Sequence, residues 1–276
     1  MTRSRLLSLV ATATLVIGAG FASTASATHD PAKPIHPGVM TFTGGAQCTS
    51  NFIFRDGGGT YIGQAAHCSG TGGATETNGC DSASLPIGTA VEVDGATRPG
   101  TLVYNSWITM QGLGETNADA CQYNDFALVR IDPADVGRVD SSIPGWGGPT
   151  ALGPSSAMLG DTVYSYGNSS LRGGVTKLGP KQGVVVQGEG NGWSRTVYTL
   201  TPGVPGDSGS AFLDGSGRAI GVLSTLQIAP VAGSNGVADL RSALGYMNAN
   251  SSFSGTTLVP GTKPFDGNFV NAIINS

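Results

Sequence analysis

The sequence has 276 residues, of which only 12% are charged, and its formal net charge at pH 7 is −4. Glycine is the commonest residue, with 44 copies, while helix-favouring Lys and Glu are scarce, which is typical of a β-rich and loop-rich globular protein. An acidic chain without clustered Lys and Arg excludes nucleic acid as a partner, because neutralising phosphates requires such clusters, and it excludes a polybasic membrane patch.

Residues 1–27 predict a secretory signal peptide. Two arginines precede an apolar stretch over residues 6–22, and Ala25-Ser26-Ala27 has the small side chains that a signal peptidase needs. A transmembrane anchor is the alternative, but the stretch is interrupted by Ser, Thr and Gly and is short for a bilayer span of about 20 apolar residues. We therefore expect a secreted, extracellular protein that begins at Thr28 and has no membrane contact after signal removal.

The chain after the signal peptide predicts two β units. Residues 28–37 are polar and Pro-rich and predict a flexible lead-in. Residues 38–140 contain short β-type segments bounded by Gly, Asn, Asp or Pro. We expect strands at 39–42, 51–54, 61–65, 89–93, 101–104 and 125–131.

The second half of the chain repeats this pattern after a break. Residues 141–156 are too rich in Gly, Pro and Ser for a regular element and predict an interdomain linker. Residues 157–250 predict a second β unit, and apolar residues at helical spacing predict a short C-terminal helix over 237–249. The expected strands are 162–166, 183–187, 196–200, 210–213 and 219–225. No role is assigned to the tail, 251–276.

The four cysteines predict disulfide bonds. Cys48, Cys68, Cys80 and Cys121 are an even number in an exported chain, and four cysteines allow three pairings, between which spacing does not decide. A zinc site that uses His67 beside Cys68 is the alternative. No short Cys-x-x-Cys spacing supports it, and the compartment is oxidising.

One histidine stands out as a candidate general base. A serine hydroxyl becomes a good nucleophile at neutral pH when an imidazole accepts its proton and a carboxylate orients that imidazole. His29 and His36 lie in or beside the polar lead-in, whereas His67 follows an apolar segment in the run Gln64-Ala-Ala-His-Cys68. On its own, such a histidine is more often a surface or packed residue.

Two further motifs change this interpretation. Asp125 begins the apolar run Asp-Phe-Ala-Leu-Val, where an aspartate alone would be read as a strand cap. In Pro205-Gly-Asp-Ser-Gly-Ser210, Gly206 and Gly209 flank Ser208 in a tight turn and let backbone N–H groups approach a bound carbonyl, as an oxyanion hole requires. Because the three motifs occur together in the order His, Asp, Ser, a chance explanation is weak.

These blocks resemble the signatures of the trypsin/chymotrypsin family of serine peptidases, in its secreted bacterial form. They are Ala65-Ala-His-Cys68, Asp125-Phe-Ala-Leu-Val129 and Gly206-Asp-Ser-Gly209, and their order differs from the subtilisin and α/β-hydrolase orders. The resemblance spans about residues 39–247. It implies an all-β fold of two six-stranded antiparallel β-barrels with the active site in the cleft between them, followed by the short C-terminal helix.

The resemblance also implies a role for individual residues. His67 would be the general base, Asp125 its orienting carboxylate and Ser208 the nucleophile. The N–H groups of Gly206 and Ser208 would form the oxyanion hole. Ser224 looks like the serine whose strand pairs with the substrate backbone.

The family's disulfide pattern suggests how the cysteines pair. In the family, the cysteine after the histidine is bonded to one on the preceding strand. That place is held by Cys48, so the resemblance implies a Cys48–Cys68 bond and leaves Cys80 to pair with Cys121.

The chain departs from the family at the positions that set specificity and activation. Pro202 stands where trypsin-like members have an aspartate that binds Lys or Arg, and Leu226 stands where a glycine commonly keeps the pocket open, so we expect a narrow or apolar pocket. Asp207 would pair with a new N-terminus in animal members and with an internal arginine in bacterial ones. That arginine's place is Ser165 here, so the partner of Asp207 is left open and a site that forms without zymogen cleavage is a hypothesis.

The function expected from the sequence is that of a secreted serine endopeptidase that hydrolyses polypeptides through an acyl-enzyme. The mechanism requires no metal and no organic cofactor, and a monomer is the default expectation. A secreted binding protein without activity on the same scaffold is the alternative, because a fold alone does not establish activity.

Overall fold

The computed structural model describes residues 30–73, 77–155, 159–227 and 232–276. The predicted signal peptide and His29 lie outside the described residues. None of the helices in the described ranges is long and apolar enough to cross a bilayer.

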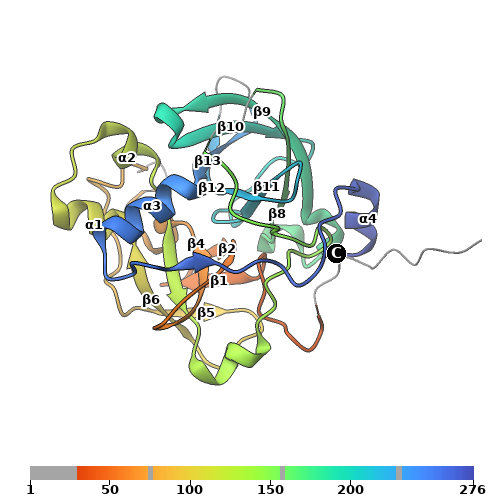
Figure 1. Ribbon diagram of the computed structural model, residues 1–276, viewed down its shortest axis with the longest axis horizontal. Coiled ribbons are helices and arrows are strands. Elements are labelled where there is room, and N and C mark those ends of the chain that lie inside the picture. The colour runs from red at the N-terminus through yellow and green to blue at the C-terminus, as the bar shows by residue number, and fades with distance from the viewer. Residues whose placement is uncertain (1–29, 74–76, 156–158, 228–231) are drawn as a thin grey trace, which may run out of the picture.

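The N-terminal half forms an eight-stranded antiparallel sheet in the order β14-β3-β4-β7-β6-β5-β1-β2 (Figure 1). Its strands are β1 (Met40–Thr43), β2 (Ala46–Thr49), β3 (Ile53–Asp56), β4 (Gly59–Gln64), β5 (Ala90–Val93), β6 (Gly100–Asn105), β7 (Ala127–Arg130) and β14 (Thr257–Leu258). The sheet is not closed, so the first of the two predicted barrels is not confirmed. The two edges of β3 are occupied by β4 and β14, which leaves no edge of β3 for β2.

The C-terminal half is a closed antiparallel barrel in the order β10-β13-β12-β11-β8-β9, which confirms one six-stranded barrel. Its strands are β8 (Thr162–Tyr166), β9 (Pro180–Glu189), β10 (Ser194–Thr199), β11 (Ala211–Asp214), β12 (Ala219–Gln227) and β13 (Ser234–Asp239). Seven buried aliphatic and aromatic side chains fill one core cluster in it: Val163, Val185, Val197, Phe212, Ile220, Leu223 and Val237.

In the described ranges, four α-helices accompany the strands: α1 (Ser106–Leu113), α2 (Ala118–Tyr123), α3 (Leu240–Asn250) and α4 (Phe269–Ile274). The predicted C-terminal helix is α3, but it begins at Leu240 rather than at residue 237. Residues 237–239 pair in β13 instead, and the Asp239 carboxylate caps α3 by accepting the N–H of Ser242 at 2.7 Å. Short 3-10 turns occur at η1 (Ala66–Ser69), η2 (Pro133–Arg138), η3 (Ser170–Arg172), η4 (Thr176–Leu178) and η5 (Gly190–Gly192).

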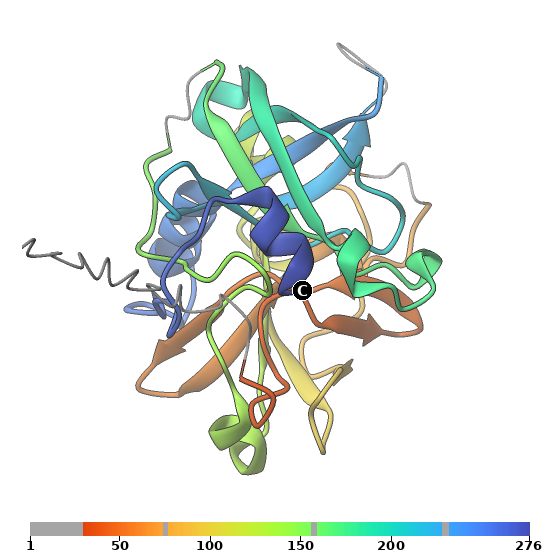
Figure 2. The same cartoon turned by 90° about the vertical axis from the view of Figure 1, so that its right-hand side faces the viewer.

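The tail and the predicted linker pack together across both halves. The tail, drawn in dark blue, supplies β14 to the N-terminal sheet and then α4, which packs against β9 (Figures 1 and 2). Trp146, in the segment predicted as a linker, is fully buried and stacks on Phe269 of α4 at a ring-centroid distance of 6.1 Å. Its Nε1 donates to the carbonyl of Ser165 at 2.7 Å. Within the predicted lead-in, Ile35 is buried.

We expect Trp146→Ala to lower the free energy of unfolding by about 3–5 kcal/mol, because the change leaves a cavity where a large buried side chain packed. Urea denaturation measures this value. Leu200→Ala is the control, since Leu200 is 72% exposed, and it should change stability by less than about 0.5 kcal/mol. Equal losses in the two variants would contradict a packing role for Trp146.

Candidate active site

The His67 side chain is held by a buried carboxylate. Asp125 lies just before β7 and is 3% exposed. Its Oδ2 is 2.7 Å from Nδ1 of His67, and its Oδ1 accepts the backbone N–H of His67 at 2.9 Å. Because an ionised carboxylate only accepts hydrogen bonds, Nδ1 carries the proton and Nε2 is left as the basic ring nitrogen.

The electrostatics of this pair favour ionised Asp125 and an imidazole of raised basicity. Burial lowers the pKa of His67, but the charge and hydrogen bond of Asp125 outweigh it and raise the pKa above 6.5. Burial raises the pKa of Asp125, while His67 and the hydroxyl of Ser224 together lower it below its usual range. Ser224 Oγ donates to Asp125 Oδ2 at 2.6 Å, which ties β12 of the barrel to the N-terminal sheet.

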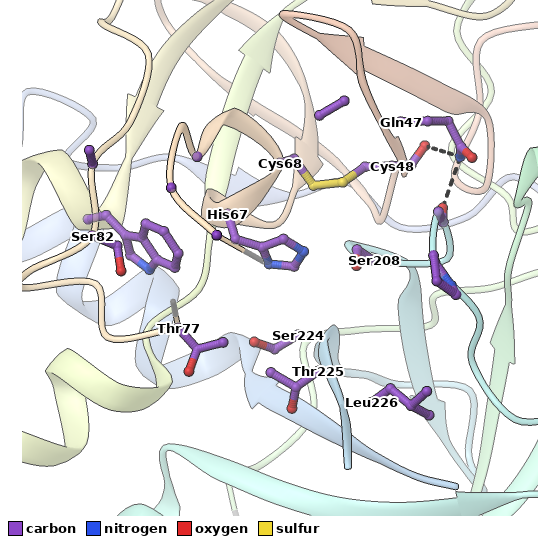
Figure 3. A pocket seen from close by; sticks show the side chains of 18 residues that line it. Gln47, Cys48, His67, Cys68, Thr77, Ser82, Ser208, Ser224, Thr225 and Leu226 are labelled. Carbon is purple, nitrogen blue, oxygen red and sulfur yellow. Dashed lines mark hydrogen bonds between the residues drawn. A yellow bond between two sulfur atoms is a disulfide. The ribbon is translucent and has the colours of Figure 1, made fainter. Parts of the chain in front are cut away.

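Ser208 lies across the same pocket from His67. The pocket has a volume of about 610 Å³, both residues line it, and Figure 3 shows the imidazole directed towards Ser208. Ser208 sits in a turn between Gly206 and Gly209, whose φ angles are +95° and +88°. A Cβ at Gly209 would also lie 2.5 Å from the carbonyl oxygen of Thr49. Both the positive φ angle and this close contact therefore require glycine at position 209.

Side-chain hydrogen bonds to the carbonyl oxygens hold the peptide groups before Ser208 in place. The carbonyl of Gly206 accepts Nε2 of Gln47 at 2.9 Å, and the carbonyl of Pro205 accepts Oγ of Ser169 at 2.5 Å. In a trans peptide the N–H points away from the carbonyl, so the N–H of Gly206 is directed opposite to Ser169. In the described part of the chain, no group accepts a hydrogen bond from the N–H of Gly206 or of Ser208. Two N–H groups are therefore available in this turn for an oxyanion.

The residue between these N–H groups, Asp207, is fully buried and meets two cations. Its Oδ2 is 2.5 Å from a guanidinium nitrogen of Arg172 and 3.1 Å from Nζ of Lys181. Nζ of Lys181 also donates to the carbonyls of Pro202 at 3.0 Å and Thr201 at 3.3 Å. Burial lowers the pKa of Lys181, the charge of Asp207 opposes this shift, and Arg172 adds to it.

Comparison with known proteins identifies the family of this chain. Residues 49–222 match the model of the trypsin-like peptidase domain family. The chain belongs to this family. No curated protein gives a significant match.

Solved structures of bacterial members resemble this trypsin-like peptidase domain. Thermobifida fusca protease A is 21% identical, with 82% of this chain and 99% of that chain covered and a TM-score of 0.53. Cellulomonas bogoriensis chymotrypsin is 19% identical, with 82% and 98% covered and a TM-score of 0.49. Nocardiopsis protease is 18% identical, with 81% and 98% covered and a TM-score of 0.46. At these identities, the likeness to the Thermobifida structure shows the fold.

The trypsin-like domain supplies the cation for Asp207 from a neighbouring strand. The family resemblance places a partner for Asp207 at position 165, where this chain has an uncharged serine. In the antiparallel pairing of β8 with β9, Ser165 lies directly opposite Lys181. Cross-strand partners share one face of a sheet, so the ammonium of Lys181 reaches the space that a longer side chain at Ser165 would fill. Lys181 can be recognised as a partner of Asp207 only from the register in which β8 pairs with β9.

The residues expected to bind substrate are not all at the pocket. Ser224 and Leu226 line it, and Leu226 is 56% exposed at its rim. Pro202 is not one of its lining residues, and the carbonyl of Pro202 is bonded to Lys181. Thr225, between Ser224 and Leu226, also lines the pocket and was not singled out from the sequence.

The cysteines are joined in the pattern that the family resemblance implies. The structure bonds Cys48 to Cys68 and Cys80 to Cys121. Sulfur atoms of Cys48 and Cys68 and a ring nitrogen of His67 lie within 4.8 Å of one another. Since disulfide sulfurs are not thiolates, this group lacks the donors that a zinc ion needs.

We expect Arg172 and Lys181 to substitute for each other as partners of Asp207. Arg172→Met or Lys181→Met alone leaves one cation, whereas the double variant leaves a buried carboxylate unpaired, which costs about 3–5 kcal/mol of unfolding free energy. Urea denaturation of the four proteins should show a double-variant loss greater than the two single losses added together. Strictly additive losses would contradict this shared role.

Proposed function

We propose that this protein is a secreted serine endopeptidase in which His67, Asp125 and Ser208 form the catalytic triad. The observation that carries the proposal is the position of His67. Its Nδ1 is anchored 2.7 Å from a buried carboxylate, and its ring faces Ser208 in a pocket lined by Gly206 and Ser208. The N–H groups of these two residues have no acceptor among the residues that the structure describes. Membership of the trypsin-like peptidase family supports the same chemistry.

The geometry supports an acyl-transfer mechanism. Oγ of Ser208 attacks the carbonyl carbon of the peptide while Nε2 of His67 takes the hydroxyl proton. The N–H groups of Gly206 and Ser208 bind the developing oxyanion. The protonated His67 then gives its proton to the leaving amine, and the acyl-enzyme on Ser208 is hydrolysed by water that His67 activates in the same way. Asp125 stabilises the imidazolium at each step.

Polypeptides are the proposed substrates, bound in extended form along residues 224–226 of β12. The residue directly before the cleaved bond would meet a narrow, apolar site beside Leu226. Lys181 argues against Lys or Arg at that position, because its buried ammonium lies against the carbonyl of Pro202, where trypsin-like relatives have an aspartate. A clear preference for cleavage directly after Lys or Arg would overturn this part of the proposal.

The proposed place of action is outside the cell, where the protein would work as a monomer. The predicted signal peptide and two disulfides support this, since disulfides persist in oxidising compartments.

The first test of the proposed function is covalent labelling with a fluorophosphonate, followed by intact-mass and peptide mass spectrometry. We expect one label on Ser208 in the secreted protein and none in Ser208→Ala. His67→Ala should slow labelling by at least about 100-fold, because no base then accepts the serine proton. Ser216→Ala is the matched control, since Ser216 is exposed on a turn of the barrel, and it should label normally. A folded protein that takes up no label would favour a binding protein without activity.

The raised pKa of His67 gives a second test. In a Ser208→Ala background, an NMR titration should place the His67 midpoint above 6.5. Asp125→Asn removes the charge that raises this pKa and keeps the burial that lowers it, so the midpoint should fall. Because catalysis needs neutral imidazole, activity of the otherwise native enzyme should rise with pH through the same midpoint. In that enzyme, Asp125→Asn alone should lower kcat by about 10⁴-fold, since the ring is left in the wrong tautomer. An unshifted midpoint would mean that Asp125 does not control His67.

A further inference from the structure

A smaller pocket, of about 200 Å³, continues the substrate groove along β12. Ser224 and Thr225 line both this pocket and the larger one that contains His67 and Ser208. Beyond these two residues, the smaller pocket is lined by Tyr123, which ends α2, and by Glu189, which ends β9. A peptide extended along β12 would therefore pass the smaller pocket on its way to the candidate nucleophile.

Glu189 gives this pocket a negative charge that no cation among the described residues compensates. Its Oε1 accepts the hydroxyl of the buried Thr196 at 2.6 Å, a neutral partner that holds the side chain in place. The pocket has no Lys, Arg or His in its described lining, and Glu189 is in no ion pair among the described residues. One carboxylate oxygen, Oε2, thus has no hydrogen-bond partner in that part of the chain.

The ring of Tyr123 forms a rigid wall beside this carboxylate. It packs so closely on Gly190 that a Cβ there would lie 2.4 Å from the ring atom Cδ2. Burial raises the pKa of Tyr123, and the negative charges of Glu189 and Asp119 raise it further. An aromatic ring beside a carboxylate attracts a cation through both the ring's quadrupole and the charge.

We propose that the pocket lined by Tyr123 and Glu189 is a subsite for a lysine or arginine side chain of the substrate. The lining of this pocket follows β12 from Ser224 to Gln227, and a peptide paired antiparallel with this strand would run towards Ser224. The basic residue would therefore stand upstream of the residue directly before the cleaved bond. The enzyme would then prefer substrates with an apolar residue directly before the cleaved bond and a basic residue further upstream. This inference rests on the proposed function, since it assigns the substrate of the same groove.

The test compares peptides that differ only at one upstream position, which carries either lysine or uncharged norleucine. For the full secreted protein, the ratio of kcat/KM for the lysine peptide to that for the norleucine peptide should reach about tenfold at one upstream position. Glu189→Gln should bring this ratio close to one, and Glu189→Lys should reverse the preference towards a glutamate peptide. Glu92→Gln, which removes an exposed carboxylate on β5, is the matched control and should keep the ratio.

The outcomes separate the subsite from the activity itself. A ratio near one at every upstream position, or a ratio that Glu189→Gln leaves unchanged in a variant with native circular dichroism, would overturn the subsite while Ser208-dependent hydrolysis upholds the proposed function. Hydrolysis of none of the peptides, together with no fluorophosphonate label, would overturn both.

Discussion

The fold depends on neutralising one buried charge, the carboxylate of Asp207. This residue separates the two N–H groups of the candidate oxyanion hole, so its position decides where they point. A carboxylate without access to water is tolerated only beside cations and hydrogen-bond donors. Arg172 and Lys181 supply the cations, and the N–H of Val204 donates to the same carboxylate oxygen at 3.1 Å. The charge of Asp207 is therefore neutralised by Arg172, Lys181 and the N–H of Val204, with no contribution from a chain terminus among the described residues.

The sequence predicted the parts of the site that are local in the chain. His67 and Asp125 each adjoin an apolar strand, and Ser208 lies between two glycines, so short motifs were sufficient to single out all three as candidates. The partners of Asp207 were beyond such reasoning. Lys181 is 26 residues from Asp207 and is recognisable only from the strand register that sets it opposite Ser165. Arg172 reaches Asp207 from the end of the short 3-10 turn η3, whose path depends on packing rather than on a pattern.

The differences between the predicted and the observed fold have the same origin. The first barrel is not closed because β14, a strand of two residues in a tail without a periodic pattern, takes the free edge of β3. The helices α1 and α2 were missed because neither has an apolar stripe. Each begins at an asparagine, Asn105 or Asn117, whose side chain accepts two backbone N–H groups, and a disulfide fastens α2 through Cys121. In short helices such as these, side-chain caps and disulfides supply the stability that an apolar stripe gives to longer helices.

The candidate triad is divided between the halves, with His67 and Asp125 on the sheet and Ser208 on the barrel, while the tail spans both. A molecule in which either half has opened lacks a complete set of catalytic groups. Proteases cleave partly unfolded molecules most readily. Partly unfolded molecules of this protein would lack an assembled triad and would be unable to cleave others. Self-digestion would then require an encounter between an intact molecule and an opened one, so it would slow as the protein is diluted.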